Sequence, residues 1–450
     1  MDLKGKKVVV VGSGVSGIGA TKLLSDVGAD TILYDGNDKL APAAIRAKLP
    51  KDTKAEIIVG EMPKDVVKST ELLVISPGVP IDSPIVKTFE AENVPVWGEI
   101  ELAYNYDQGT VYAITGTNGK TTTTTLVGEI MKAHNASTFV VGNIGTSYTG
   151  EALKTSPKSV TVAEISSFQL ETIHDFAPKI TAILNITPDH LNRHYTMENY
   201  IAVKESITKN QKEGDFCVLN YDDEALRAFG KTIDNAVYFS RSTKPEKGAF
   251  LEHDMIKYNY GDSVIDVINV KDMQIFGNHN YENAMAAVAM TILAGVPVAI
   301  IAKVLKEFKG VEHRIEFTRE LNGVKYYNDS KGTNPDSSIK ALEAMNTRIV
   351  LIAGGYDKHS EFDEFLDAFG GKVKLLVLLG VTAPKIEATA RAHGFDAIVK
   401  VATLEEAVKI CYYNAAPGEA VLLSPACASW DMFKSYEERG KLFKEYVNSL

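Results

Sequence analysis

The chain has 450 residues and a net charge of −10; charged residues make up 24% of it and hydrophobic residues 45%. This length predicts about two to four domains, each with its own core, and the acidic balance without a Lys/Arg-rich run argues against a nucleic-acid partner. No apolar run reaches bilayer-spanning length, no secretory cleavage signal is present, and three scattered cysteines fit neither a disulfide framework nor zinc, so we expect a cytoplasmic protein without membrane insertion.

The first block opens with an apolar strand at 7–11 that runs into Gly12-Ser13-Gly14-Val15-Ser16-Gly17. A helix pattern follows, and a second strand at 31–34 ends at Asp35. A G-x-G-x-x-G turn between strand and helix, with an acidic residue roughly 20 positions on, is the fingerprint of a dinucleotide site. The same turn can accept any nucleoside diphosphate, and the fingerprint alone does not decide between the two.

A further apolar strand at 71–75 ends in Ser76-Pro77-Gly78. Such strand ends line the ligand crevice of an open α/β sheet, which makes Gly78 a candidate contact, although a plain turn explains the tripeptide equally well. The block ends near Trp97-Gly98-Glu99, and we expect the first domain to span residues 1–98.

The second block contains the most informative stretch of the chain. An apolar strand at 110–115 runs into Gly116-Thr117-Asn118-Gly119-Lys120-Thr121-Thr122, which opens an amphipathic helix pattern. Glycines let backbone N–H groups approach phosphate oxygens, and a helix N-terminus adds a favourable partial charge. Lys120 can reach the terminal phosphates of a nucleotide, and the Thr121 hydroxyl can ligate Mg²⁺. The usual first glycine of such a loop is replaced by Ile114, but strand, loop and helix stand in the order that indicates a phosphate site.

Two later strands of this block end in polar residues. The strand at 160–164 ends in Glu164, a carboxylate well placed for Mg²⁺, which prefers hard oxygen ligands; a solvated edge residue is an equal alternative. The strand at 180–186 leads into a polar cluster with His190, and histidine can act as a metal ligand or an acid–base group. Further strands are expected at 138–141 and 216–219.

The end of the second block changes character. Between residues 237 and 275, short β-like runs with Gly and Asp turns suggest an antiparallel patch. A helix at 281–293 follows Asn278 and Asn280 and contains Asn283. Asn amides can pair with the edge of an adenine ring, whereas helix capping would explain one of the three asparagines. A second helix, at 299–308, stops before Gly310, and we expect the second domain to span 99–310.

The third block, residues 311–450, resembles another Rossmann-like domain. Its expected strands lie at 324–328, 348–353, 374–379 and 420–423, separated by helical patterns, and a helix at 433–447 closes the chain. Glu312-His313-Arg314 stands at the boundary, where Arg suits phosphate recognition and a solvated hinge is the alternative. Asn328-Asp329-Ser330-Lys331-Gly332-Thr333-Asn334 follows a strand and offers charge, hydroxyls and N–H groups, unless it is an ordinary capped turn.

Taken together, these stretches resemble the Mur ligases, which assemble the peptidoglycan precursor. The resemblance rests on Gly-Thr-Asn-Gly-Lys-Thr at 116–121, His-Asn-x-x-Asn at 279–283, Glu-His-Arg at 312–314 and Asn-Asp-Ser-Lys-Gly-Thr-Asn at 328–334. EISSFQLE at 164–171 and LSPACASWDMF at 423–433 are similar to the members that add D-glutamate. The motifs cover the whole chain in order.

The resemblance implies an α/β fold of three domains: an N-terminal Rossmann-like domain, a central P-loop ATPase domain with a mostly parallel sheet, and a C-terminal Rossmann-like domain. The first domain would hold the UDP part of the substrate and not NAD, the second ATP and Mg²⁺, and the third the amino acid. The substrates would be UDP-N-acetylmuramoyl-L-alanine and D-glutamate. ATP would phosphorylate the substrate carboxylate, the amine would attack the acyl phosphate, and ADP and phosphate would be released.

The resemblance also implies roles for individual residues. Lys120, His190 and Lys204 would be catalytic. ATP would contact Gly116, Thr117, Asn118, Gly119, Lys120, Thr121 and Thr122, and its nucleoside Asn283, His313, Arg314 and Asp329. Mg²⁺ would be held by Thr121, Glu164, His190 and Lys204, the last as a carbamate because an ammonium cannot ligate a cation. The UDP-sugar would contact Ser13, Gly14, Val15, Ser16, Asp35, Gly78 and Asn143, and D-glutamate Thr333, Lys358, Ser429 and Tyr436.

Three alternatives remain at this point. Another Mur ligase or a folylpolyglutamate synthase-like amide ligase would share the phosphate loop but not the 423–433 stretch. A NAD(P)-dependent oxidoreductase would use the turn at 12–17 but leave Lys120 unexplained. A non-catalytic nucleotide-binding protein would not need an intact Lys120, Glu164 and His190.

Overall fold

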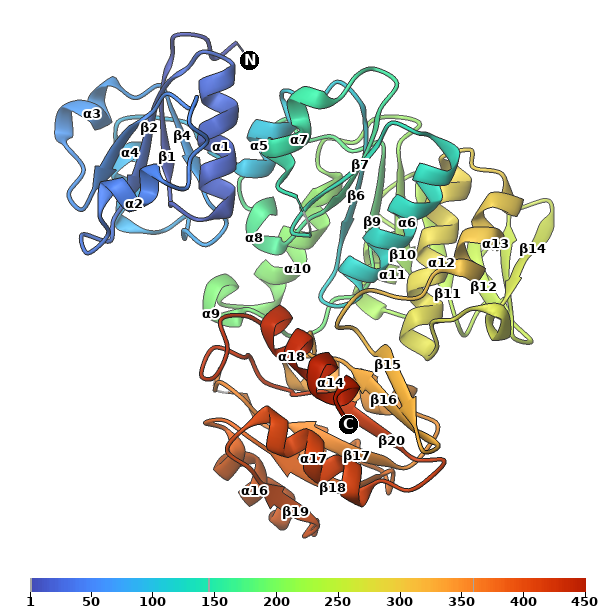
Figure 1. The fold of residues 1–450 in the computed structure, drawn as a ribbon. Coiled ribbons are helices and arrows are strands. Elements are labelled where there is room, and N and C mark those ends of the chain that lie inside the picture. Colours follow the sequence, from blue (N-terminus) through green and yellow to red (C-terminus); the bar gives the residue numbers. More distant parts are fainter. Residues whose placement is uncertain (1, 145, 359) are drawn as a thin grey trace. The chain divides into compact units, whose positions relative to one another are not determined.

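The computed structural model describes residues 2–144, 146–358 and 360–450, which form three sheets flanked by helices (Figure 1). The chain divides into two compact units. The first consists of residues 1–272 and 282–306 and carries the first two sheets; the second consists of residues 273–281 and 307–450 and carries the third. Among the described residues, no helix has the length and apolar character that a membrane crossing requires.

The first sheet has five parallel strands in the order β3-β2-β1-β4-β5. Its strands are β1 (Lys7–Val11), β2 (Asp30–Asp35), β3 (Glu56–Val59), β4 (Leu72–Ile75) and β5 (Val96–Gly98). The helices that accompany them are α1 (Val15–Asp26), α2 (Pro42–Arg46), α3 (Lys64–Ser69), α4 (Pro84–Ala91) and α5 (Glu99–Tyr104). The order changes direction between β1 and β4, and their carboxyl ends form the crevice where sheets of this type bind ligands.

Both faces of the first sheet are buried because its strands are continuous apolar runs. Along β1, Val8 and Val10 belong to one core cluster together with Leu23 of α1. Val9 and Val11 belong to another cluster together with Phe89 of α4. Successive side chains of a strand point to opposite faces, so a run without polar residues is typical of a strand covered by helices on both sides.

One of these two cores continues into the central domain. Ile100 of α5 belongs to the same cluster as Val8 and as Tyr148 of α7 (Tyr148–Glu151). In α5, the fully buried carboxylate of Glu101 accepts hydrogen bonds from three consecutive N–H groups of residues 174–176, at 2.8, 2.8 and 3.2 Å. These donors satisfy a charge whose burial would otherwise be costly. The first two sheets are therefore joined by a common core and a polar clamp.

The second sheet has nine strands in the order β14-β13-β12-β11-β10-β9-β6-β8-β7. They are β6 (Thr110–Thr115), β7 (Thr138–Gly142), β8 (Val160–Glu164), β9 (Ile180–Ile183), β10 (Phe216–Asn220), β11 (Ala236–Ser240), β12 (Gly248–Glu252), β13 (Met255–Asn259) and β14 (Val264–Asn269). The sheet is parallel from β7 to β12, and β12, β13 and β14 are antiparallel, which confirms the patch expected between residues 237 and 275.

The helices around the second sheet include short ones at the edge where the carboxyl ends of the strands lie. Besides α7, they are α6 (Lys120–His134), α8 (Ser167–Leu170), α9 (Leu191–His194), α10 (Met197–Glu205), α11 (Glu224–Phe229), α12 (Asn278–Leu293) and α13 (Val298–Glu307), with 3₁₀ turns at Ala152–Lys154, Ser206–Thr208 and Val270–Asp272. The strand expected at 180–186 ends at Ile183, because the next residues turn toward the loop after β6: Thr117 donates its N–H to the Asn185 carbonyl at 2.9 Å.

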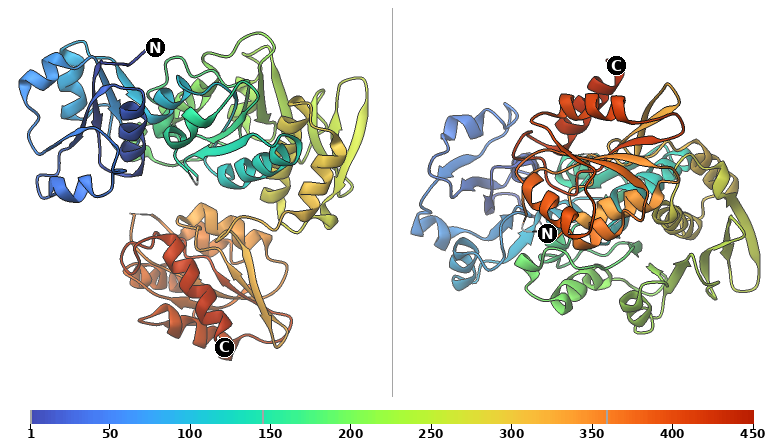
Figure 2. Two further views of the ribbon diagram at one scale, coloured as in Figure 1. Left: turned by 45° about the horizontal axis from the view of Figure 1, so that its top comes forward. Right: turned by 90° about the horizontal axis from the view of Figure 1, so that it is seen from below.

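The third sheet has six strands in the order β15-β16-β20-β17-β18-β19, all parallel except the β15–β16 hairpin. They are β15 (Glu316–Leu321), β16 (Val324–Asn328), β17 (Ile349–Ala353), β18 (Val373–Leu378), β19 (Ile398–Lys400) and β20 (Ala420–Leu423). The helices are α14 (Pro335–Ala344), α15 (Asp363–Asp367), α16 (Ala383–Ala392), α17 (Leu404–Asn414) and α18 (Tyr436–Asn448). Separate apolar clusters on its two faces, one with α14 to α16 and one with α17 and α18, enclose the sheet between helices (Figure 2).

Candidate active site

The loop between β6 and α6 is shaped to receive phosphate. Gly116 and Gly119 have φ angles of +147° and +83°, a region that side chains other than glycine rarely occupy. A Cβ on Gly119 would lie 2.2 Å from Oδ1 of Asn283, which also accepts a hydrogen bond from Thr123 at 3.3 Å. The structure thus places the predicted Asn283 of α12 against the phosphate loop, and Thr121 and Thr122 lie buried in the first turn of α6.

Two lysine ammonium groups converge on one carbonyl of this loop. Lys120 donates to the carbonyl oxygens of Gly116 at 2.8 Å and Thr117 at 2.7 Å, and Lys204 of α10 donates to Gly116 at 2.8 Å. Lys204 is 1% exposed, and its Nζ lies 4.7 Å from the ring centroid of Tyr200. Burial, together with the Lys120 charge, holds the pKa of Lys204 well below its ordinary value. The structure therefore brings both predicted lysines to the phosphate loop.

Glu164 offers an oxygen ligand at the end of the neighbouring strand. It is 1% exposed, and it lies at the end of β8 in register with Ile114 of β6 and Gly142 of β7. Its Oε1 accepts a hydrogen bond from Asn143 at 2.9 Å, whereas the buried Oε2 has no hydrogen-bond partner among the described residues. An orphaned carboxylate oxygen beside a phosphate loop fits Mg²⁺, which takes one or two carboxylates and completes its shell with water and phosphate oxygens.

His190 stands on a loop that is tied to the same region. Its backbone is left-handed, with φ of +53°, and its ring meets the Phe168 ring edge-on at a centroid distance of 4.8 Å. Three residues further along, the Arg193 guanidinium lies 4.9 Å from the centroid of the same Phe168 ring and forms an ion pair with Glu171 at 2.5 Å. Among the described residues, no three His, Cys, Asp or Glu side chains form a metal-sized cluster, so the role of His190 as a Mg²⁺ ligand stays a prediction.

Two residues that hold the phosphate loop in place were absent from the sequence-based prediction. Asn185 accepts the N–H of Asn118 at 2.8 Å through its side chain and donates back to the Asn118 carbonyl at 3.1 Å. The Tyr200 hydroxyl lies 3.1 Å from the Thr117 hydroxyl in the buried wall of the site. The position of Asn185 in the polar run at the end of a strand is a sequence feature that could have identified it. No sequence feature indicates the role of Tyr200.

In the first sheet, the turn after β1 and the end of β2 hold each other. Asp35 accepts hydrogen bonds from the N–H of Ser13 at 3.1 Å and from its hydroxyl at 2.5 Å. Burial opposes ionisation of Asp35, but these bonds and one from the Asn37 N–H outweigh it and hold the pKa of the carboxyl below its usual value. Val15, at the start of α1, is 80% exposed, which leaves this helix end open to a ligand.

Four more candidates lie in this domain and its neighbour: Gly14, Ser16, Gly78 and Asn143. Gly14 and Ser16 flank Val15 at the N-terminus of α1. Gly78 is exposed after β4, with open space where a Cβ would stand. Asn143, expected to touch the UDP-sugar, directly follows β7 and donates its side-chain amide to Glu164 at 2.9 Å. Their contacts with a UDP-sugar stay predictions.

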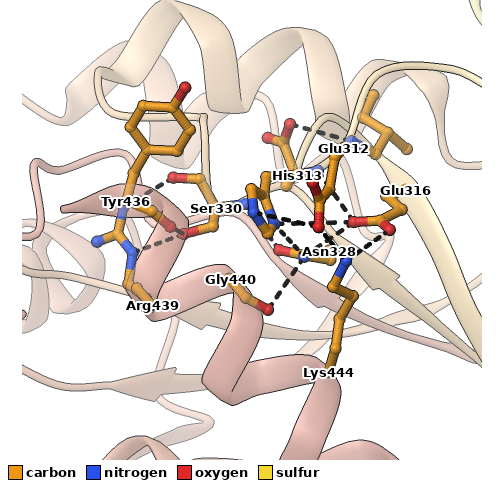
Figure 3. A network of polar contacts seen from close by, with 11 residues as sticks. Glu312, His313, Glu316, Asn328, Ser330, Tyr436, Arg439, Gly440 and Lys444 are labelled. Atoms are coloured by element: carbon orange, nitrogen blue, oxygen red, sulfur yellow. Dashed lines mark hydrogen bonds and ion pairs between the residues drawn. The ribbon is translucent and has the colours of Figure 1, made fainter. Parts of the chain in front are cut away.

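In the second unit, His313 lies inside a polar network (Figure 3). The side chain is 2% exposed, and its Nδ1 lies 2.9 Å from the Asn328 amide, which also donates to Glu316 at 3.1 Å and to the Gly440 carbonyl at 3.2 Å. A Cβ at position 440 would come within 2.3 Å of the ring. Burial lowers the pKa of His313 and favours the neutral imidazole. Its role at the nucleoside stays a prediction.

Asp329 follows β16 and is fully buried. It accepts hydrogen bonds from the Ser424 hydroxyl at 2.7 Å and the Ile315 N–H at 3.2 Å. Burial raises the pKa of this carboxyl to about 6, although the Arg314 charge and the hydrogen bonds act in the opposite direction. The two predicted nucleoside contacts, Arg314 and Asp329, are therefore electrostatically coupled within one unit.

The residues expected at D-glutamate follow three strands of the third sheet, β16, β17 and β20. Thr333 comes after β16, Lys358 after β17 and Ser429 after β20, and Tyr436 opens α18. Because these strands are parallel neighbours, their carboxyl ends meet at one edge of the sheet. The structure thus brings all four to the same side of the third sheet, while their contacts with an amino acid stay predictions.

Arg439 of α18 was absent from the sequence-based prediction and connects two of these loops. Figure 3 shows its contact with Ser330. Its guanidinium donates to the hydroxyl of Ser330 at 2.9 Å and its carbonyl at 2.8 Å, and to the Cys427 carbonyl at 3.2 Å. The residue is 1% exposed, and burial lowers its pKa to about 10. No sequence signal distinguishes it from a surface arginine, because its partner Ser330 is more than a hundred positions away and Cys427 contributes only a backbone carbonyl.

The fold and this geometry define a class of protein. A glycine-containing loop opens a helix at the carboxyl edge of a mostly parallel sheet, and two lysines converge on the loop. The neighbouring strand ends in a buried carboxylate, one oxygen of which has no hydrogen-bond partner in the described part of the chain. These are the parts of an enzyme that binds and uses a nucleoside triphosphate.

The particular family follows from comparison with known proteins. The chain matches the Mur ligase MurD-like N-terminal domain over residues 6–98, the Mur ligase middle domain over 114–291 and the Mur ligase glutamate ligase domain over 313–427. It is 59% identical to the UDP-N-acetylmuramoylalanine–D-glutamate ligase of Lachnospira eligens over 451 residues and 48% identical to that of Clostridioides difficile over 452, with 100% of each chain covered. The chain belongs to the Mur ligase family, which confirms the resemblance seen in the sequence.

Solved structures confirm the fold. The UDP-N-acetylmuramate–alanine ligase MurC of Thermotoga maritima aligns with a TM-score of 0.63 at 20% identity, over 99% of both chains. The MurF ligase of Thermotoga maritima in complex with ADP aligns with a TM-score of 0.61 at 19% identity, over 99% of this chain and 96% of that one. The expected architecture of three α/β domains with mostly parallel sheets is therefore correct.

Proposed function

We propose that this chain ligates D-glutamate to UDP-N-acetylmuramoyl-L-alanine in the cytoplasm, using ATP and releasing ADP and phosphate. The choice of substrates rests on the identity of 59% to a ligase of that name over the full length of both chains. The observation that carries the chemistry is the buried Glu164, whose unpartnered oxygen lies on the strand beside the phosphate loop.

The reaction needs ATP because a carboxylate and an amine do not condense in water. An oxygen of the substrate carboxylate attacks the γ-phosphorus of ATP, the bond to ADP breaks, and an acyl phosphate forms. The amine nitrogen of D-glutamate then attacks the acyl carbon, phosphate leaves, and the nitrogen loses a proton to a base. Two anions meet in the first step, so positive charge and positioning supply most of the catalysis.

Lys120 supplies such a charge. In this structure its ammonium rests on carbonyls of its own loop, at 2.7 and 2.8 Å, and a nucleotide phosphate would replace these neutral acceptors with charged ones. Thr121 and Glu164 would hold Mg²⁺, which neutralises developing charge on the phosphoryl oxygens when bound. His190 and Lys204 complete the proposed ligand set for a second ion.

Lys204 can be an oxygen ligand only after modification. Its nitrogen bonds to the carbon of carbon dioxide and releases a proton, which gives a carbamate with two oxygen donors. The deep burial of this side chain, 1% exposed against the phosphate loop, disfavours a permanent ammonium and favours the neutral amine that this reaction needs. An ordinary lysine on a helix surface extends into solvent, whereas Lys204 is buried and donates to the Gly116 carbonyl.

We further propose domain boundaries at 1–98, 99–310 and 311–450, with the UDP moiety on the first domain and D-glutamate on the third. In a dinucleotide site, the acidic residue at the end of β2 binds a ribose hydroxyl. Here Asp35 accepts two hydrogen bonds from Ser13, so the turn itself uses this carboxylate. The preference for a UDP moiety over NAD is supported by the match of residues 6–98 to the Mur ligase MurD-like N-terminal domain and by the name of the 59% identical relative.

Product analysis tests the proposal. The purified chain is mixed with ATP, Mg²⁺ and UDP-N-acetylmuramoyl-L-alanine, with D-glutamate, L-glutamate or no amino acid added. We expect ADP and inorganic phosphate in equal amounts, formed only with D-glutamate. Formation of AMP and pyrophosphate, or equal turnover with the L-isomer, would contradict the proposal.

A further inference from the structure

The loops after β17 and β20 carry two large aromatic side chains in the open. Trp430 is 62% exposed and Tyr356 is 42% exposed, and their ring centroids lie 5.6 Å apart. Neither ring is part of the core of its domain. Lys358 follows Tyr356 by two residues, and its Nζ lies 5.2 Å from the centroid of the Trp430 ring. This distance is within the range of a cation–π contact, for which tryptophan is the best partner.

The backbone that bears Trp430 is fixed on both sides. The N–H of Tyr356 donates to the Ala428 carbonyl at 2.8 Å, which ties the two loops together. The Ser429 carbonyl accepts the N–H groups of residues 432 and 433 at 3.1 and 2.8 Å. The Asp431 carboxylate accepts the N–H of Val381 at 2.9 Å. The indole is therefore an exposed ring on a rigid turn, a suitable platform for a flexible lysine.

We propose that Trp430 is a positioning residue: its indole face holds the Lys358 ammonium at the place where a carboxylate of the incoming D-glutamate binds. The inference rests on the proposed function. An unrestrained lysine has four rotatable bonds, and its ammonium samples many positions, so each binding event must select one of them. A ring beneath the ammonium restricts it beforehand, and the N–H groups on the side of the ammonium away from the ring can then donate to a carboxylate.

The expected effect is specific to one substrate. A cation–π contact at an exposed site changes an equilibrium constant by about two- to fivefold. Trp430→Ala should therefore raise the KM for D-glutamate by about that factor, with little change in the KM for ATP. Trp430→Phe keeps an aromatic face, so its KM for D-glutamate should stay close to that of the parent. Tyr413→Ala is the matched control, because Tyr413 is a 78% exposed aromatic residue on α17 in the same domain.

A double-mutant cycle with Lys358→Ala tests whether Trp430 acts through the lysine. We expect Lys358→Ala alone to raise the KM for D-glutamate by a larger factor than Trp430→Ala, and Trp430→Ala to add nothing in the Lys358→Ala background. An equal effect of Trp430→Ala in both backgrounds would overturn the proposal, because it would show a role independent of Lys358. An unchanged KM in Trp430→Ala would overturn it as well.

The same experiment separates this inference from the proposed function. If Lys358→Ala raises the KM for D-glutamate and Trp430→Ala does not, the positioning role is wrong and the D-glutamate site stands. If the parent shows no turnover dependent on D-glutamate, the proposed function itself fails. Thermal unfolding of each variant checks that the exposed ring contributes little to stability, as expected for a side chain outside the core.

Discussion

Asp329→Asn should remove a pH dependence from the free energy of unfolding of the second unit. The carboxyl is fully buried, and its pKa in the folded chain is raised to about 6, against about 3.9 in an unfolded chain. At pH values below both pKa values, the carboxyl is protonated in the folded and in the unfolded chain, so it makes no pH-dependent contribution to the free energy of unfolding. As the pH rises from about 4 to about 6, unfolding releases a proton, so the free energy of unfolding falls; above the folded pKa the loss is constant.

The size of this loss follows from the shift. Two pKa units correspond to roughly 3 kcal/mol, at about 1.36 kcal/mol for each unit. Asparagine cannot ionise. Its carbonyl oxygen can keep the bond from the Ser424 hydroxyl, while its amide nitrogen loses the bond from the Ile315 N–H, a cost that does not vary with pH. The free energy of unfolding of Asp329→Asn, relative to the parent, should therefore grow by about 3 kcal/mol between pH 4 and pH 7.5, which is roughly 6–12 °C in Tm for a unit of this size.

Calorimetric unfolding of the full chain at several pH values measures this difference. Asp396→Asn, at a side chain that is 77% exposed, is the control and should show little pH-dependent change. A difference between Asp329→Asn and the parent that is constant with pH would refute the reasoning, because it would show that Asp329 ionises as readily inside the protein as outside. Loss of activity in Asp329→Asn is expected if this carboxylate binds the nucleoside.

Three further predictions concern the proposed active site. Lys120→Ala should lower turnover by at least about a hundredfold, since it removes roughly 3 kcal/mol of electrostatic stabilisation; a near-parental rate would exclude Lys120 from catalysis. Carbon NMR with isotopically labelled bicarbonate should show a carbamate signal that is absent from Lys204→Arg, and no signal in the parent would mean an unmodified amine. UDP-N-acetylmuramoyl-L-alanine should bind saturably in a titration that NAD⁺ does not disturb, whereas competition by NAD⁺ would restore the dinucleotide interpretation.

The alternation of strands and helices could be predicted because most core strands are unbroken Val/Ile runs. β1 and β17 are examples, each buried on both faces. β5 and β19 were missed because each has three residues, too few for any periodicity to appear. The helix expected from residue 433 begins at Tyr436, since the N–H groups of residues 432 and 433 first close a turn on Ser429.

Residues of the candidate site could be predicted where they lie at or just after the end of a strand. Lys120 and Glu164 follow adjacent parallel strands, so their proximity follows from topology. Residues that act through long-range backbone contacts gave no such signal. Arg439, for example, donates to the carbonyl of Ser330, which is more than a hundred positions away in the sequence. Their importance depends on where other parts of the chain lie, which a local pattern does not contain.

The common core of the first two sheets limits how the chain can be dissected. A fragment ending at residue 98 would lose Ile100 and the rest of α5, and the cluster that contains Val8 would be open to water on one side. A fragment beginning after α5 would leave the amides of residues 174–176 without the Glu101 carboxylate that binds them. Expression of isolated pieces, or their exchange between related enzymes, should therefore retain residues 1–272 together with residues 282–306. Chimeras joined at residue 98 would need matching apolar surfaces on both sides of the junction.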